Sequence, residues 1–351
     1  LEAPDWARLG EHLPFDWIEQ ALASTDALSI RHRRLPAEQV VWLMVALALY
    51  RHKSIGEVLD DLGLATPSEQ TPFVSKSAAA QARQRVGPEP LKWLFDHSAG
   101  NWVAQDKRAY LFKGLQLFAM DGTTLRTHDT EKNREHFGAQ GYAGGTVASY
   151  PQVRGVTLTA LTTHLVHSAA FGPYSTNEML YAKQLIEAIP EESLTVFDRG
   201  FLSAEILCSL TSSGGERHFL IPAKSNTKWE VVDGSGNDAV VRMRVSPQAR
   251  KKSPELPEFW EARAITVVDT QARKRILLTS LRDRQRYKPA DIVALYDKRW
   301  GIETSYRELK QTMLGTALTL RSKTVDGVYQ EIWGSLIAYN LIRLEIAKAA
   351  L

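Results

Sequence analysis

The sequence predicts an α/β protein in which a mixed sheet is flanked by helices, preceded by an all-α region and interrupted by a mainly β insertion. Three observations support this. Helical patterning fills the first 109 residues, alternating apolar and polar runs begin at Tyr110, and short β-like stretches between Gly, Ser and Pro clusters occupy residues 228–281. At 351 residues, the chain is long enough for two or three domains. We divide it into residues 1–109, 110–224, 225–285 and 286–351.

The first region contains clear helix signals. Pro36 suits a first helical turn, and the apolar run from 40 to 50 after it predicts a core helix. Ser54 and Glu57 have the spacing of a capping box. An Ala-rich helix with Gln and Arg follows at 77–86. With the preceding short helix it could form a helix-turn-helix that reads a DNA major groove, and an ordinary solvated helix is the equal alternative.

Strands follow from residue 110 onward. The run 115–120 predicts a buried strand that ends at Asp121, residues 150–172 predict a hairpin, and 194–197 predict a strand that ends at Asp198. Two long helices are expected at the C-terminal end, over 291–313 and 327–351.

The net charge of +3 hides a local excess of cations. Residues 242–288 contain thirteen Lys or Arg and five Asp or Glu, a net of +8, so the remainder carries −5. Clusters of this kind are either solvated turns or a phosphate-binding surface, and their concentration in one insertion favours the surface. The clustered candidates are Arg250, Lys251, Lys252, Arg273, Lys274 and Arg275.

Cysteine content and hydropathy indicate a cytoplasmic protein. The single Cys208 allows no intrachain disulfide and no multi-cysteine zinc site, which is typical of a reducing compartment. The longest apolar run has eleven residues and is too short to span a bilayer.

Several acidic residues are candidates for chemistry. Asp121 and Asp198 each follow an apolar strand, where ligands collect in α/β sheets, although an aspartate there is often only a turn or cap residue. On the expected helix 291–313, four polar residues fall within about 60° of one face, at roughly 100° per residue. They are Tyr296, Arg299, Glu303 and Lys310. A surface ion pair between Arg299 and Glu303 would explain two of them.

The spacing of these four residues resembles the Y-R-E-K signature of the bacterial insertion sequence four family of transposases. The motif FDRGF around Asp198 is similar to the second-aspartate motif of that family, and MDGTTLRT around Asp121 is similar to the first. YPQVRGV, SPQARKK and RELKQTMLGTALTLRSK are also similar in kind, so the resemblance runs from about residue 35 to the C-terminus.

The resemblance implies a DDE transposase with a catalytic triad of Asp121, Asp198 and Glu303 on an RNase H-like core. It also implies an insertion domain between the second aspartate and the glutamate, which agrees with the β-rich region 225–285. Three carboxylates with phosphate oxygens can hold two divalent ions for in-line phosphodiester displacement, and oxygen ligands suit Mg²⁺, with Mn²⁺ as a substitute. We therefore expect two ions per active site.

The implied reaction is cut-and-paste transposition, in which end phosphodiesters are hydrolysed, a hairpin forms, and the 3′-OH is joined to target DNA. The implied partners are double-stranded DNA, at terminal inverted repeats and target sites, and a second copy of the chain on paired ends in the nucleoid. Residues 1–109 would bind DNA, and Tyr296, Arg299 and Lys310 would hold the terminal phosphates and hairpin.

Two other functions remain as alternatives: a domesticated DNA-binding protein derived from a transposase, and a general metal-dependent nuclease. Trp229 and Trp260 lie in the segment where this family places an aromatic that stacks on a flipped base, although core packing is the simpler interpretation. His164 and His167 have no third ligand nearby in the sequence and are interpreted as structural.

Overall fold

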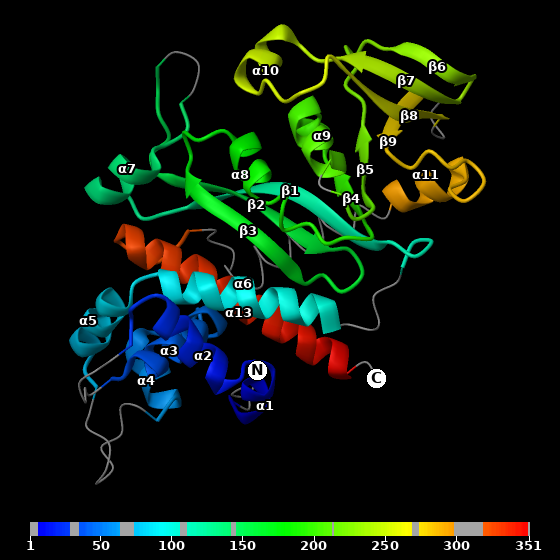
Figure 1. The fold of residues 1–351 in the computed structure, drawn as a ribbon. Helices are drawn as coiled ribbons and strands as arrows, with labels where there is room; N and C mark the ends of the chain where they lie inside the picture. Colours follow the sequence, from blue (N-terminus) through cyan, green and yellow to red (C-terminus); the bar gives the residue numbers. More distant parts are fainter. Residues whose placement is uncertain are drawn as a thin grey trace.

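The computed structural model describes residues 6–28, 35–63, 74–105, 111–141, 145–212, 214–268, 274–297 and 319–349. Within these ranges, a nine-stranded mixed sheet is flanked by helices on both faces, and a helical region packs beneath it (Figure 1). This confirms the predicted α/β class. No helix in the described ranges is long and apolar enough to cross a membrane.

The N-terminal region is helical, as predicted. Its core helix α3 follows Pro36 and is buried almost throughout, because apolar residues occupy every face of it. The capping box is present, since Ser54 accepts from the Glu57 backbone while the Glu57 carboxylate accepts from Ser54 N at 2.7 Å. The helices are α1 (Trp6–His12), α2 (Phe15–Ser24), α3 (Ala37–Leu49), α4 (Ile55–Asp61), α5 (Lys76–Val86) and α6 (Glu89–Gln105).

The sheet has the strand order β3-β2-β1-β4-β5-β9-β8-β7-β6. The first three strands are antiparallel, β1, β4 and β5 are parallel, and the last four strands form an antiparallel extension. The bounds are β1 (Gln116–Arg126), β2 (Gln152–Ala160), β3 (Val166–Pro173), β4 (Ser193–Phe197), β5 (Arg217–Pro222), β6 (Glu230–Ser235), β7 (Asp238–Arg244), β8 (Phe259–Val268) and β9 (Lys274–Thr279).

The β-rich segment predicted at 225–285 does not form a sheet of its own. Its strand β9 pairs with β5, from Leu220 opposite Thr279 to Pro222 opposite Leu277, so the four strands extend the core sheet. Arg263, which is 0% exposed, fixes this extension: it binds Asp238 through two bonds of 2.7 Å and donates to the carbonyls of Leu281 and Tyr287.

The remaining helices cover the sheet or connect its strands. The C-terminal helix α13 runs beside α6 beneath β1–β3, whereas α8 and α9 lie on the opposite side (Figure 1). Their bounds are α7 (Glu131–Phe137), α8 (Glu178–Gln184), the 3₁₀ turn η1 (Arg199–Phe201), α9 (Ala204–Ser212), α10 (Pro247–Lys252), α11 (Pro289–Asp297) and α13 (Val325–Ala349). Of the long helix predicted at 291–313, the part from 298 onward lies outside the described residues.

Candidate active site

The register of the two central parallel strands places Asp121 beside Asp198. The pairing of β1 with β4 ends at Met120 opposite Phe197, and the two aspartates are the residues that directly follow this pair in the sequence. Neighbouring strands lie about 4.8 Å apart, so the two residues are neighbours although 77 positions separate them in the sequence. Both side chains are partly exposed, which leaves the carboxylates accessible.

Asp121 lies inside its strand, and the prediction that the strand ends there was wrong. β1 continues to Arg126 because β2 pairs with it along its whole length, including Asp121 opposite Thr157 and Gly122 opposite Val156. This pairing outweighs the turn tendency of an Asp-Gly sequence. The Gly122 amide donates to Asp121 Oδ1 at 2.8 Å and restricts the orientation of the carboxylate.

Asp198 ends β4, as predicted, and has a second local role. It is the N-cap of η1, and its Oδ2 accepts from the Gly200 amide at 3.3 Å. The carboxylate is therefore directed by the turn that follows the strand.

Both aspartates belong to the sheet face on which α11 packs. Side chains alternate along a strand, so Asp121 shares a face with Leu117, and Asp198 shares one with Val196. These apolar residues form one buried cluster with Ile292, Leu295 and Tyr296 of α11. We call this side of the sheet the α11 face. The helix that carries the start of the Y-R-E-K signature therefore lies on the face where the two carboxylates are found.

Only Tyr296 of the four signature residues is within the described part of the chain. Its side chain is 7% exposed, packs in the α11-face cluster, and has the Arg275 guanidinium 5.9 Å from its ring centroid. Arg299, Glu303 and Lys310 lie outside the described residues, as does Arg273. Among the described residues, no group of three His, Cys, Asp or Glu side chains has the spacing of a metal site. The two aspartates offer the hard oxygen ligands that Mg²⁺ and Mn²⁺ prefer.

A further carboxylate near the aspartates was missed by the sequence analysis. Glu178, the first residue of α8, is partly buried, and its carboxylate lies against Gly122. Burial raises the pKa of Glu178, the charge of Asp198 raises it further, and Arg154 opposes both effects. No motif marks Glu178 in the sequence, because its proximity depends on how α8 packs on the sheet.

The basic clusters differ in how exposed they are and in whether they pair with acidic side chains. Arg250, Lys251 and Lys252 form the exposed last turn of α10, whereas Lys274 and Arg275 begin β9 and Arg275 lies 3.6 Å from Asp297. Many other cations of the insertion are paired with acids. The pairs are Arg242 and Arg282 with Glu261, Arg244 with Glu258, Arg263 with Asp238, and Arg284 with Asp233. Asp238 and Asp233 lie outside residues 242–288, so these two acids offset part of the local net charge of +8.

The proposed helix-turn-helix pair corresponds to α4 and α5, and the residues between them include 64–73, which are outside the described ranges. Arg83 of α5 does not reach outward: its Nε donates to Gln330 of α13 at 3.3 Å. Gln81, Gln84 and Arg85 remain exposed.

A cleft of about 870 Å³ lies between α4 and α5 on one side and the segment 321–327 on the other. Its lining residues include the cations Arg83, Lys132, Arg321 and Lys323.

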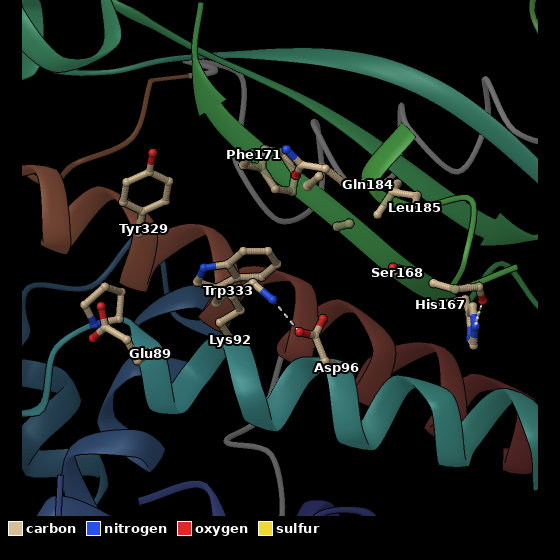
Figure 2. A pocket seen from close by; sticks show the side chains of 14 residues that line it. Glu89, Lys92, Asp96, His167, Ser168, Phe171, Gln184, Leu185, Tyr329 and Trp333 are labelled. Atoms are coloured by element: carbon tan, nitrogen blue, oxygen red, sulfur yellow. Dashed lines mark hydrogen bonds and ion pairs between the residues drawn. The ribbon is translucent and has the colours of Figure 1, made fainter. Parts of the chain in front are cut away.

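The weaker candidates have structural roles. Trp229 and Trp260 pack against the core, with the Trp260 ring 6.2 Å from that of Phe219. His167 Nε2 lies 3.0 Å from the Ala188 carbonyl, and burial lowers the pKa of this histidine. His167 lines a second cavity, which has a volume of about 570 Å³. Trp333 of α13 also lines this cavity (Figure 2). Neither aspartate lines that cavity.

Comparisons with known proteins agree along most of the chain. Residues 113–341 match the family described as transposase DDE domain, and residues 5–96 match insertion element 4 transposase N-terminal. The transposase InsG for insertion sequence element IS4 of Escherichia coli K12 is 40% identical over 343 residues, which are 97% of this chain and 77% of that protein. The putative transposase InsZ of the same organism is 36% identical over 241 residues, 68% of this chain and 79% of that one. A cryo-EM structure of the piggyBac transposase synaptic complex with hairpin DNA aligns with a TM-score of 0.48 and 12% identity, covering 98% of this chain and 75% of that one.

Proposed function

The chain belongs to the insertion element 4 type of DDE transposases, and on this premise we propose that Asp121, Asp198 and Glu303 are its catalytic triad. The observation that carries the proposal is the register of β1 and β4, which makes the first two acids neighbours on the α11 face. The helix α11 packs on the same face and ends at Asp297, six residues before Glu303 in the sequence.

The donor set fits divalent cations. Enzymes of this family use divalent metal ions, and carboxylate oxygens favour Mg²⁺ or Mn²⁺. When bound, two such ions would stabilise the attacking and the leaving oxygen of an in-line displacement. The protein side chains hold and orient this centre: the Gly122 amide directs Asp121, and η1 directs Asp198.

We further propose the reaction course of cut-and-paste transposition, with end hydrolysis, a hairpin intermediate and transfer of the 3′-OH to target DNA. Tyr296, Arg299 and Lys310 would hold the terminal phosphates, while the exposed turn Arg250–Lys252 would follow the DNA backbone. The substrates would be terminal inverted repeats in the bacterial nucleoid, bound by a homodimer on paired ends. The family matches do not favour a domesticated DNA-binding protein.

The test is cleavage of DNA that carries the sequence flanking the gene, in the presence of Mg²⁺. We expect Asp121→Asn and Asp198→Asn each to lower the nicking rate at least about a thousandfold, because several kcal/mol of transition-state stabilisation would be lost. DNA affinity should stay within about threefold of wild type, because one amide replaces one acid of similar shape. Asp129→Asn, an exposed acid beyond the same strand, is the matched control and should cut normally.

Wild-type rates in the amide variants would exclude the triad. Cutting of DNA without inverted repeats at the same rate would instead indicate a general nuclease.

A further inference from the structure

Glu178 is held in a fixed place at the start of α8. Asn177 caps this helix by accepting from the Met179 amide at 3.0 Å. Tyr181 fastens the helix to β3, since its hydroxyl donates to the Pro173 carbonyl at 3.0 Å and fills the space above Gly172. The helix thus packs on the sheet beside β2 and β3, opposite α13 (Figure 1). The first residue of α8 therefore has little freedom to move away from the sheet.

Gly122 provides the space that the Glu178 carboxylate occupies. A Cβ added at residue 122 would collide with Glu178 Oε1 and Cδ, so any larger residue would displace this side chain. Gly122 directly follows Asp121, and alternation along β1 directs the two residues to opposite faces. Glu178 therefore approaches the aspartates from the face opposite α11.

Two charges of opposite sign act on the Glu178 carboxylate, and the attraction by Arg154 is stronger than the repulsion by Asp198. Asp198 acts on it from the end of β4 and Arg154 acts on it from β2, where it pairs with Thr124 of β1. Arg154 is itself fixed, because its guanidinium lies 4.0 Å from the Tyr174 ring centroid and Nη1 donates to the Thr176 carbonyl at 3.1 Å. The negative charge of Glu178 is thus partly offset by one fixed cation and also acts on the neighbouring aspartate.

We propose that Glu178 is a positioning residue of the acidic site formed by Asp121 and Asp198. The charge of Glu178 strengthens the attraction of this site for divalent cations, and the positive charge of Arg154 reduces that attraction. The proposal rests on the proposed function, since it assumes that the two aspartates bind metal. The Glu178 carboxylate lies against Gly122, the residue after Asp121, so its charge adds to the potential at a bound dication, and in partly buried surroundings this attraction is incompletely screened. Without the cation, burial of the charge and repulsion by Asp198 together outweigh the attraction by Arg154, so the charge of Glu178 destabilises the metal-free protein and favours the loaded one.

The experiment measures Mn²⁺ binding to the full chain without DNA, by the electron paramagnetic resonance signal of free Mn²⁺, together with the melting temperature of the metal-free protein. For Glu178→Gln we expect the half-saturating Mn²⁺ concentration to rise by about threefold to tenfold, on the scale of a partly screened charge. The metal-free melting temperature should rise, because the cost of burying the charge and the repulsion by Asp198 are removed, and together they exceed the attraction by Arg154. Arg154→Gln should lower the half-saturating concentration.

The control is Glu187→Gln, an exposed carboxylate shortly after α8, which should bind Mn²⁺ as the wild type does. A purely structural Glu178 would give a lower metal-free melting temperature and an unchanged half-saturating concentration, and either result overturns the proposal. Asp121→Asn distinguishes a failure of the proposed metal site from a failure of the proposed role of Glu178. If that variant binds Mn²⁺ like wild type, the metal site itself is misassigned; if it loses binding while Glu178→Gln does not, only the role of Glu178 fails.

Discussion

Two groups of carboxylates in this protein have opposite surroundings. Glu331 of α13 binds Arg51 Nη1 at 2.8 Å and accepts from the backbone amides of Arg321 and Ser322 at 2.9 and 3.0 Å. Burial lowers the pKa values of Arg83 and Arg321, and the charge of Glu331 opposes this effect at both. At the proposed active site, in contrast, the negative charge of Asp198 repels that of Glu178 and helps to raise the Glu178 pKa.

The difference separates a carboxylate whose pairing stabilises the fold from carboxylates that are proposed to bind a cation. Glu331 joins the segment before α13 to Arg51 of the N-terminal helical region, so its negative charge is compensated within the protein. Compensation of this kind would leave an active-site carboxylate with little affinity for a metal ion. If Asp121 and Asp198 bind metal as proposed, the charge of Glu178 favours the metal-loaded protein, and substitutions of Glu178 and of Glu331 should change the stability of the metal-free protein in opposite directions.

The largest expected effect on stability is that of Glu331→Gln. Its side chain is only 9% exposed, and removal of the charge leaves arginines buried without their acid, which typically costs about 3 to 5 kcal/mol. Urea denaturation measures the loss. Asp326→Asn, exposed on the first turn of the same helix, should change stability by less than about 1 kcal/mol. Glu178→Gln should keep or raise the stability of the metal-free protein, and an equal loss in Glu178→Gln and Glu331→Gln would remove the distinction.

A smaller effect is expected for Arg263→Met in the insertion. Asp238 keeps 22% of its side chain exposed, so water can solvate its carboxylate and the loss should be about 2 to 3 kcal/mol near neutral pH. Arg263 holds the pKa of Asp238 below its usual value. This pair therefore stabilises the fold above the unfolded-state pKa, near 4, and the stabilisation disappears as the pH falls through the lower folded-state pKa.

Denaturation curves collected between pH 7 and pH 2.5 check this sign. The difference between wild type and Arg263→Met should be constant above about pH 5 and should shrink in acid. A difference that grows as the pH falls would contradict the assignment of the depressed pKa to this pair.

The smallest effect is expected for Glu258→Gln. Glu258 lies 3.1 Å from Arg244, but the two side chains are 47% and 69% exposed. Exposed pairs contribute about 0 to 1 kcal/mol, so its midpoint of urea unfolding should barely move. A loss comparable to that of Glu331→Gln would mean that arginine pairing stabilises this protein regardless of burial.

Local features of the fold were predictable from the sequence. The capping box at Ser54, the core helix after Pro36 and the hairpin of β2 and β3 depend on residue patterns that act over a few positions. Asp121 and Asp198 were identified as candidates for the same reason, since each follows an apolar strand pattern. Their motifs then indicated the family that the comparisons confirm.

Features that depend on distant partners were not predictable. The extension of β1 beyond Asp121 is imposed by β2, and the attachment of the insertion through β9 depends on β5. Charge counting could not distinguish the buried Arg263 from the exposed Lys251, because pairing with Asp238 is a tertiary contact. Glu178 was missed for the same physical reason.

The hydrogen-bonded junction of β9 with β5 has a mechanical consequence. β5 in turn pairs with β4, which ends at Asp198, so a continuous ladder of backbone bonds connects the insertion to the active site. Tilting the insertion about this border would require these bonds to break, and Arg263 further stiffens the strands beyond it. The insertion should therefore behave as a rigid extension of the sheet, so that its outer strands stay at a constant distance from Asp198 and do not move about a hinge.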